Sequence, residues 1–137
     1  MADYKYLLPQ PDEETKPFWD GTKKHELHIQ RCADCKTYRH PPEKTCSKCY
    51  SENVTWEKVS GRGTIYSYIR VFQPVLPQWR ESAPYNIVQV ALEEDPEIIL
   101  TGNAPGEGDA KLKVGLRVKV TFDDVAEDVS IPRWTPA

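Results

Sequence analysis

The sequence lacks the features of several large protein classes. No stretch approaches the roughly 20 consecutive apolar residues that a membrane-spanning helix needs. Positive charge is not in excess either, because 18 Lys and Arg stand against 21 Asp and Glu, for a formal net charge of −3. A dedicated DNA or RNA binder usually has a clearly basic domain. Met1–Lys5 contains no apolar stretch of the kind found in signal peptides, so we expect a cytoplasmic protein. The lack of a long apolar run and of excess positive charge predicts that it binds neither membrane nor nucleic acid.

Recognisable catalytic signatures are also missing. All four cysteines fall in one cluster, which leaves no spare thiol to act as a nucleophile, and no serine has a G-x-S-x-G context. The glycine-rich stretch 101–108 is neither G-x-G-x-x-G nor a Walker A motif. Acidic clusters at 93–95 and 123–124 fall in predicted turns, where carboxylates are usually solvated. We therefore expect no catalysis by this chain alone.

The clearest positive signal is the cysteine cluster. Two Cys-x-x-Cys pairs, Cys32/Cys35 and Cys46/Cys49, are separated by a short loop that carries Pro41-Pro42. Each pair can form a tight knuckle whose sulfurs point to one centre. Zn²⁺ in structural sites accepts four thiolates in a closed tetrahedron. The pattern predicts a structural zinc ribbon with these four ligands.

Other uses of the cysteines fit less well. Disulfides require an oxidising compartment, and a thioredoxin-like redox pair requires a single Cys-x-x-Cys that opens a helix in a βαβ unit. A rubredoxin-type iron site stays open, because four cysteines do not by themselves select the metal. His25 and His28 are not needed as ligands beside four thiolates, and His40 is expected at the surface.

The rest of the chain predicts a small β protein. A short helix is expected over residues 15–24, with Thr15 as N-cap and Pro17 in the first turn. Strands are predicted over residues 27–31, 54–57, 64–72, 85–92, 97–101 and 116–122, with a last short strand around Val129 and Ile131. Five short strands in the C-terminal part suggest a closed barrel, most often an OB-fold. The predicted units are an arm and helix over 1–26, a zinc ribbon over 27–58 and a five-stranded OB-fold over 59–137.

Two segments carry large apolar residues that are candidates for a contact surface. Phe18 and Trp19 are the apolar residues of the predicted helix, and the long loop 73–84 carries Leu76 and Trp79 among three prolines. Long apolar loops are often contact surfaces. The alternative for both segments is that these side chains pack on the chain's own core.

The order of motifs along the chain resembles the DUF35 family, in which a rubredoxin-like zinc ribbon is fused to an OB-fold. The resemblance covers nearly the whole chain and rests on these features in sequence: Pro17-Phe18-Trp19, the two Cys-x-x-Cys pairs, Pro41-Pro42, Trp56, the run from Ser60 to Tyr68 (S-G-R-G-T-I-Y-S-Y), Ala83-Pro84-Tyr85, and Val114-Gly115 before a V-x-V-x-F strand.

The resemblance implies a noncatalytic subunit of a thiolase-superfamily complex that acts on acyl-CoA esters. Partners in the family include degradative thiolases, such as a benzoylsuccinyl-CoA thiolase, retro-aldolases and C-acyltransferases. The zinc ligands carry over onto the four cysteines, while CoA or acyl-CoA would be bound mainly by the partner. Phe18, Trp19, Leu76 and Trp79 are predicted to contact partner or substrate, and Arg62, Arg70 and Arg80 are candidates for the CoA phosphates.

A second interpretation comes from a different functional class. Zinc ribbons and OB-folds can bind single-stranded nucleic acid through stacked aromatics and a basic groove. Tyr66, Tyr68 and Phe72 are candidates for such a platform. The acidic net charge argues against it, because phosphate binding depends on Lys and Arg.

Overall fold

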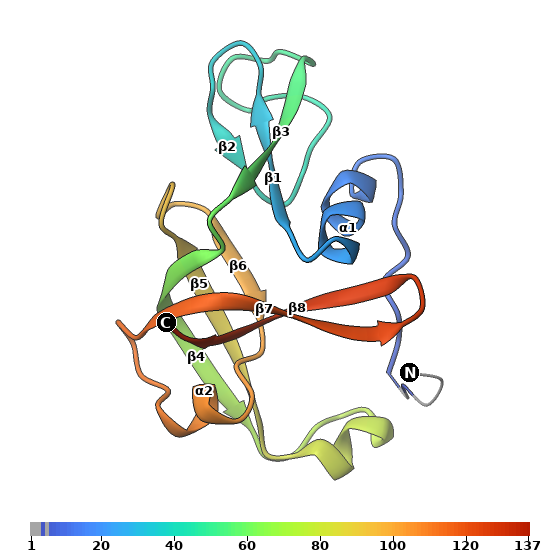
Figure 1. Cartoon of the computed structure of the whole chain (residues 1–137), viewed down its shortest axis with the longest axis vertical. Coiled ribbons are helices and arrows are strands. Elements are labelled where there is room, and N and C mark those ends of the chain that lie inside the picture. The colour runs from blue at the N-terminus through green and yellow to red at the C-terminus, as the bar shows by residue number, and fades with distance from the viewer. Residues whose placement is uncertain (1–3, 5) are drawn as a thin grey trace.

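The computed structural model describes residue 4 and residues 6–137, and Figure 1 shows a small sheet and a helix set against a larger, curled sheet. The arm predicted over residues 1–14 lies partly outside this range. The elements are α1 Lys16–Lys23, β1 Leu27–Cys32, β2 Tyr38–Arg39, β3 Val54–Val59, β4 Arg62–Val71, the 3₁₀ helix η1 Pro77–Ser82, β5 Tyr85–Leu92, β6 Ile99–Gly102, α2 Glu107–Ala110, β7 Arg117–Ala126 and β8 Val129–Pro136. Among the described residues, no helix has the length and apolar character needed to cross a membrane.

Helix α1 begins as the sequence predicts, but with a different cap. Thr15 occupies the N-cap position without making a side-chain cap hydrogen bond. Asp12 orders the entry instead, because its Oδ1 accepts from the Thr15 backbone N at 2.8 Å and from the Thr15 hydroxyl at 3.0 Å. These bonds hold the pKa of Asp12 below its usual value. The helix buries Phe18 against β1 and β8.

The small sheet has the order β2-β1-β3. Strand β1 pairs antiparallel with β3 along its full length, from Leu27 opposite Val59 to Cys32 opposite Val54. Leu27 and Ile29 are almost fully buried, so the alternation predicted for this strand places its apolar face inward. This sheet carries the cysteine knuckles at the end that lies far from the larger sheet (Figure 1).

Two glycines connect the two sheets. Gly61 has a φ of +76°, in the left-handed region that favours glycine. A Cβ on Gly63 would lie 2.5 Å from the backbone oxygen of Ala91, so only glycine allows β4 to approach β5 this closely. The sequence predicted a turn over residues 60–63, but Arg62 and Gly63 already belong to β4, so only Ser60 and Gly61 link β3 to β4.

The larger sheet has five strands in the order β6-β5-β4-β7-β8. It curls until its edge strands meet, and the Trp134 backbone N on β8 donates to the Asn103 carbonyl just after β6 at 3.0 Å. This confirms the predicted mainly-β fold, with a short helix, a cysteine cluster and an OB-fold half-barrel. The side chains inside the curl are Ile65, Val88, Val90, Leu92, Leu100, Val118 and Trp134, and all are almost fully buried.

One prediction about the C-terminal hairpin was wrong, because Asp123 and Asp124 lie within β7 and not in a turn. The last strand, expected around Val129 and Ile131, is β8, and it extends to Pro136. The loop over 73–84 also contains η1, which the sequence did not indicate.

Candidate functional site

The four cysteine sulfurs meet at the far end of the ribbon. Their Sγ atoms all lie within 4.8 Å of one another, with Cys32–Cys49 at 3.5 Å and Cys35–Cys46 at 3.6 Å. Four sulfurs at about 2.3 Å from a tetrahedral Zn²⁺ are about 3.8 Å apart. The geometry therefore fits a four-sulfur metal site, and the zinc-ribbon cysteines are positioned for a metal ion.

The backbone forms two equivalent knuckles around this centre. Each knuckle ends four residues after its first cysteine in a residue with positive φ, Lys36 at 65° and Tyr50 at 62°. Backbone N–H groups point at the sulfurs, from Cys35 to Cys32 Sγ at 3.5 Å and from Lys48 to Cys46 Sγ at 3.4 Å. Such donors favour the thiolate form that a metal requires.

The electrostatics of the sulfurs agree with this arrangement. The backbone N–H of Cys35 lowers the pKa of Cys32 to about 6. The backbone N–H of Cys49 likewise lowers the pKa of Cys46. Although the Ser51 N–H acts in the opposite direction, the sulfur of Cys32 and burial raise the pKa of Cys49 to about 12. Without a metal, Cys32 and Cys49 therefore differ in how readily they lose a proton. A cation at the centre would favour the thiolate at all four positions.

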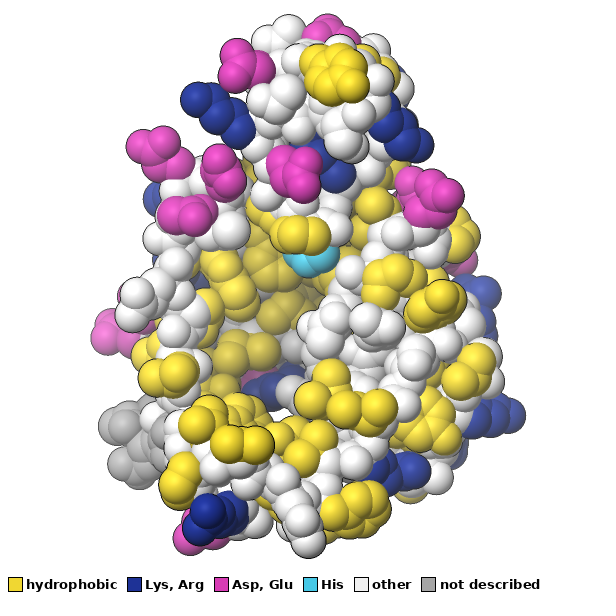
Figure 2. Space-filling view, turned by 180° about the vertical axis from the view of Figure 1, so that it is seen from behind, with side chains coloured by type: hydrophobic (Ala, Val, Ile, Leu, Met, Phe, Trp, Pro, Cys, Tyr) yellow, Lys and Arg dark blue, Asp and Glu magenta, His cyan; other side chains and the backbone are white. Residues whose placement is uncertain are grey.

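A cleft of about 430 Å³ lies where helix α1, the loop after β2, and strands β6 and β8 come together. Figure 2 shows the corresponding hollow below the ribbon, with mostly hydrophobic side chains along its walls. Its lining comprises Tyr4, Thr15, Phe18, Trp19, His40, Pro41, Pro42, Trp79, Leu100, Thr101, Gly102, Asn103, Ile131, Pro132, Arg133 and Trp134. Apolar walls with a few polar groups are typical of small-molecule sites.

Three of the four predicted contact residues share this cleft. Phe18, Trp19 and Trp79 all line it, although 60 residues separate Trp19 from Trp79 in the sequence. Leu76 is 48% exposed just before η1 and is not part of the lining. The Trp79 ring stacks on Tyr6 of the N-terminal arm, with centroids 3.9 Å apart. Whether these residues contact partner or substrate stays a prediction.

His40 is not the surface residue that the sequence suggested. Its imidazole is half-buried in the cleft wall, with its ring centroid 5.5 Å from that of Phe18. Burial lowers its pKa below the ordinary value, because the charged form loses its hydration. His40 therefore contributes a neutral ring to the cleft at neutral pH.

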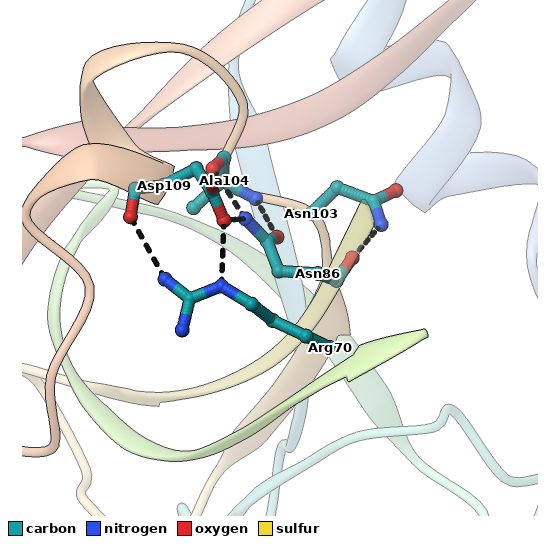
Figure 3. A network of polar contacts seen from close by, with 5 residues as sticks. All are labelled: Arg70, Asn86, Asn103, Ala104 and Asp109. Carbon is teal, nitrogen blue, oxygen red and sulfur yellow. Dashed lines mark hydrogen bonds and ion pairs between the residues drawn. The ribbon is translucent and has the colours of Figure 1, made fainter. Parts of the chain in front are cut away.

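The three arginines proposed for CoA phosphates do not form one cluster. Arg62 and Arg70 lie eight positions apart on β4, roughly 26 Å at about 3.3 Å per residue, and Arg80 lies on η1. Arg70 is engaged by Asp109, with its Nε 3.3 Å from the carboxylate and its Nη2 donating to the Asp109 carbonyl at 3.0 Å. Figure 3 shows this pair beside Asn86. Their phosphate role stays a prediction.

One functional candidate was missed altogether. Arg133 lines the cleft and also a second cavity of about 400 Å³, and its side chain is only 19% exposed. In the sequence it stands between Pro132 and Trp134, in a segment predicted to follow the last strand. Nothing local distinguished it from a surface arginine.

Comparisons with known proteins identify the architecture. The rubredoxin-like zinc ribbon domain of ChsH2 matches residues 19–55, and the C-terminal OB-fold domain of ChsH2 matches residues 56–123. A DUF35 domain-containing scaffold protein of Methanocaldococcus jannaschii is 33% identical over 127 residues, covering 90% of this chain and 86% of the relative. The chain belongs to the DUF35 family. The family resemblance stated from the motif order is thus confirmed.

Other relatives of this DUF35 chain are larger proteins. The 3-oxo-4,17-pregnadiene-20-carboxyl-CoA hydratase alpha subunit of Mycobacterium tuberculosis is 35% identical over 95% of the chain, and a probable enoyl-CoA hydratase alpha subunit of Thermomonospora curvata is 34% identical over 97%. The DUF35 chain spans only 40% and 41% of their lengths.

Two solved structures share the fold. The DUF35 chain of an Ltp2-ChsH2(DUF35) aldolase superposes with a TM-score of 0.82 at 30% identity, covering 93% of this chain and 98% of that one. A DUF35 protein of unknown function from Sulfolobus solfataricus superposes with a TM-score of 0.63 at 18% identity, covering 98% and 90% of the two chains. The second likeness concerns the fold alone.

Proposed function

We propose that this chain is a noncatalytic, zinc-containing subunit of an acyl-CoA enzyme complex whose catalytic partner belongs to the thiolase superfamily. The reaction would break or form a C–C bond next to a CoA thioester, as in a degradative thiolase such as benzoylsuccinyl-CoA thiolase. The observation that carries the proposal is the likeness to the DUF35 chain of the Ltp2-ChsH2(DUF35) aldolase, which extends over almost the whole of both chains.

The variety of the relatives supports a noncatalytic role. Their names describe a hydratase subunit, an aldolase and a scaffold protein, yet all share the part of the sequence that this chain comprises. A segment common to such different activities is better explained as a structural or binding module than as the source of one reaction. The hydratase subunits also have more than half of their length outside the shared part.

The chain's own residues suggest how it would contribute. The four cysteines would hold zinc and fix the ribbon, which has little apolar core of its own. The ribbon loop, helix α1 and the OB-fold together form the apolar cleft. The chain would stabilise its partner and add these walls to the acyl-binding site, while the partner binds most of the CoA.

The test is a tagged purification from the native host, with mass spectrometry of co-eluting proteins and metal analysis of the same fraction. We expect a stoichiometric thiolase-superfamily protein and one zinc per chain. Recovery of the chain alone, or with single-stranded nucleic acid that salt releases, would overturn the proposal.

A further inference from the structure

Arg133 is the cationic side chain at the junction of two cavities. Arg133 lines both the apolar cleft described above and the second cavity, and the two cavities share Trp79, Asn103 and Arg133. The two cavities differ in character. The second has polar side chains such as Ser82, Asn86 and Asp109 beside apolar ones such as Pro84 and Tyr85. A ligand that crosses the junction therefore meets apolar walls on one side and a positive charge at the boundary.

The charge of Arg133 is only partly neutralised. Its Nε and Nη2 lie 3.4 Å and 3.3 Å from Asp123 Oδ2, which are long contacts to a carboxylate that is itself 51% exposed. Its Nη1 donates to Asn103 Oδ1 at 2.8 Å. Because a guanidinium has five N–H donors, these three contacts leave two N–H groups without a partner among the described residues.

The guanidinium is held in place by a buried polar network. The Asn103 side-chain N donates to the Asn86 carbonyl, so its oxygen turns toward Arg133. Asn86 is 4% exposed and is fixed in turn by both backbone groups of Ala104, its Nδ2 donating at 2.7 Å and its Oδ1 accepting at 2.8 Å (Figure 3). Such preorganisation is what a binding group requires.

We propose that Arg133 anchors the carboxylate of an apolar ligand whose body lies in the aromatic-lined cleft. Charge decides between a carboxylate and a phosphate. Asp109 and Asp123 also line the second cavity, and they already pair with Arg70 and Arg133. Because these carboxylates offset the two guanidinium charges, the site tolerates one added negative charge better than the two of a phosphate monoester. Arginine pairs bidentately with carboxylates in partly desolvated sites. The ligand class is thus a monocarboxylate, or an acyl group with a free carboxylate, attached to a ring or branched apolar body.

This inference deepens the proposed function and rests on it for the source of the ligand, but direct binding can be measured on the full chain without its partner. Three of the four tryptophans, Trp19, Trp79 and Trp134, line the cleft, and the fourth, Trp56, lies on β3. Intrinsic fluorescence therefore reports occupancy. The probe is 3-phenylpropionate, compared with its neutral amide and with adenosine 3′,5′-bisphosphate, which represents the phosphates of CoA.

We expect saturable quenching by 3-phenylpropionate with a dissociation constant on the order of 0.1–1 mM, as suits a ligand of this size. The amide should bind about tenfold to 100-fold more weakly. Arg133→Gln should lose the same factor for the acid alone, and Arg133→Lys should lie between, since lysine keeps the charge without the bidentate geometry. Arg117→Gln is the matched control, because Arg117 is 60% exposed on β7 and outside both cavities.

Equal binding of acid and amide, or unchanged acid binding by Arg133→Gln with wild-type circular dichroism, would overturn the anchoring role. Tighter binding of the bisphosphate than of the acid would overturn the choice of a carboxylate. If the acid binds through Arg133 but no thiolase-superfamily protein co-purifies, the proposed function fails while the site stands. The reverse result leaves the proposed function intact and removes the site.

Discussion

At the scale of single residues, the metal centre depends on four sulfurs from two knuckles that have the same backbone geometry. Cys32 and Cys46 are buried, whereas Cys35 and Cys49 are exposed. Their spacing alone indicated a shared centre, because a Cys-x-x-Cys turn brings its two sulfurs together whatever surrounds it. This is why the cluster could be predicted without any knowledge of the tertiary fold.

Replacement of one buried sulfur should therefore unfold the ribbon. We predict that Cys46→Ala loses its metal and the near-UV signal of the ribbon, since metal binding at such sites contributes on the order of 10–16 kcal/mol. Ser47→Ala, one position along in the same knuckle and exposed, is the control. Metal analysis and circular dichroism are the measurements. An unchanged melting temperature in a metal-free Cys46→Ala protein would contradict the structural role.

His40 gives a prediction about pH. Burial places its folded-state pKa below the ordinary value of 6.5, so the folded protein favours the neutral ring. Its contribution to stability is complete above about pH 6.5 and is lost as the pH falls through the folded-state pKa. Urea denaturation between pH 7.5 and 5 should show a smaller decline in the free energy of unfolding for His40→Gln than for the wild type. Identical slopes would mean that His40 is not desolvated.

At the scale of elements, helix α1 joins the ribbon to the OB-fold through one aromatic side chain. Phe18 is 8% exposed and belongs to the common core of both sheets. We predict that Phe18→Ala lowers the free energy of unfolding by about 3–5 kcal/mol, as for other buried phenylalanines. Phe72→Ala is the matched control, because Phe72 is 68% exposed and should change stability by less than about 0.5 kcal/mol. Similar losses in the two variants would show that α1 is not docked as described.

The segment between β6 and α2 is held by the buried side-chain amide of Asn86. The Asn86 side chain hydrogen-bonds to the backbone N–H and carbonyl of Ala104, and its Nδ2 also donates to Asp109 Oδ1 at 2.9 Å. Asn86→Ala should cost about 1–3 kcal/mol, because it leaves buried backbone groups unpaired. Gln89→Ala tests an exposed position on the same strand and should be nearly neutral. Equal denaturation midpoints for the two variants would contradict the role of the network.

Strands with a regular period were predictable, whereas the full length of the C-terminal hairpin was not. From Arg117 to Phe122, β7 alternates polar and apolar residues in sequence, and its apolar positions are the buried or half-buried ones, so its period identified it. Strand β8 contains Pro132, and a proline usually indicates the end of a strand. Because β8 is an edge strand that pairs with β7 along one side, it tolerates the missing N–H. The pair Asp123-Asp124 suggested a turn because adjacent carboxylates are usually solvated. Both side chains are indeed exposed, but they lie on a strand.

At the scale of the whole molecule, the cleft is a product of tertiary structure. Phe18, Trp79 and Arg133 come from three separate segments, and no pattern within any one of them reveals that they meet. The aromatic residues could be proposed because large apolar side chains in a helix and a loop are unusual. Arg133 could not, because its partner Asn103 is 30 positions away and its role depends on the folded barrel.

At the level of the complex, we propose that this chain supports catalysis without performing it. The most direct test measures turnover of an acyl-CoA substrate by the co-purified partner alone, by this chain alone and by the reconstituted complex. We predict no turnover by this chain alone, and far higher activity or stability for the complex than for the isolated partner. Turnover by this chain alone, or full activity and stability of the partner without it, would contradict the account.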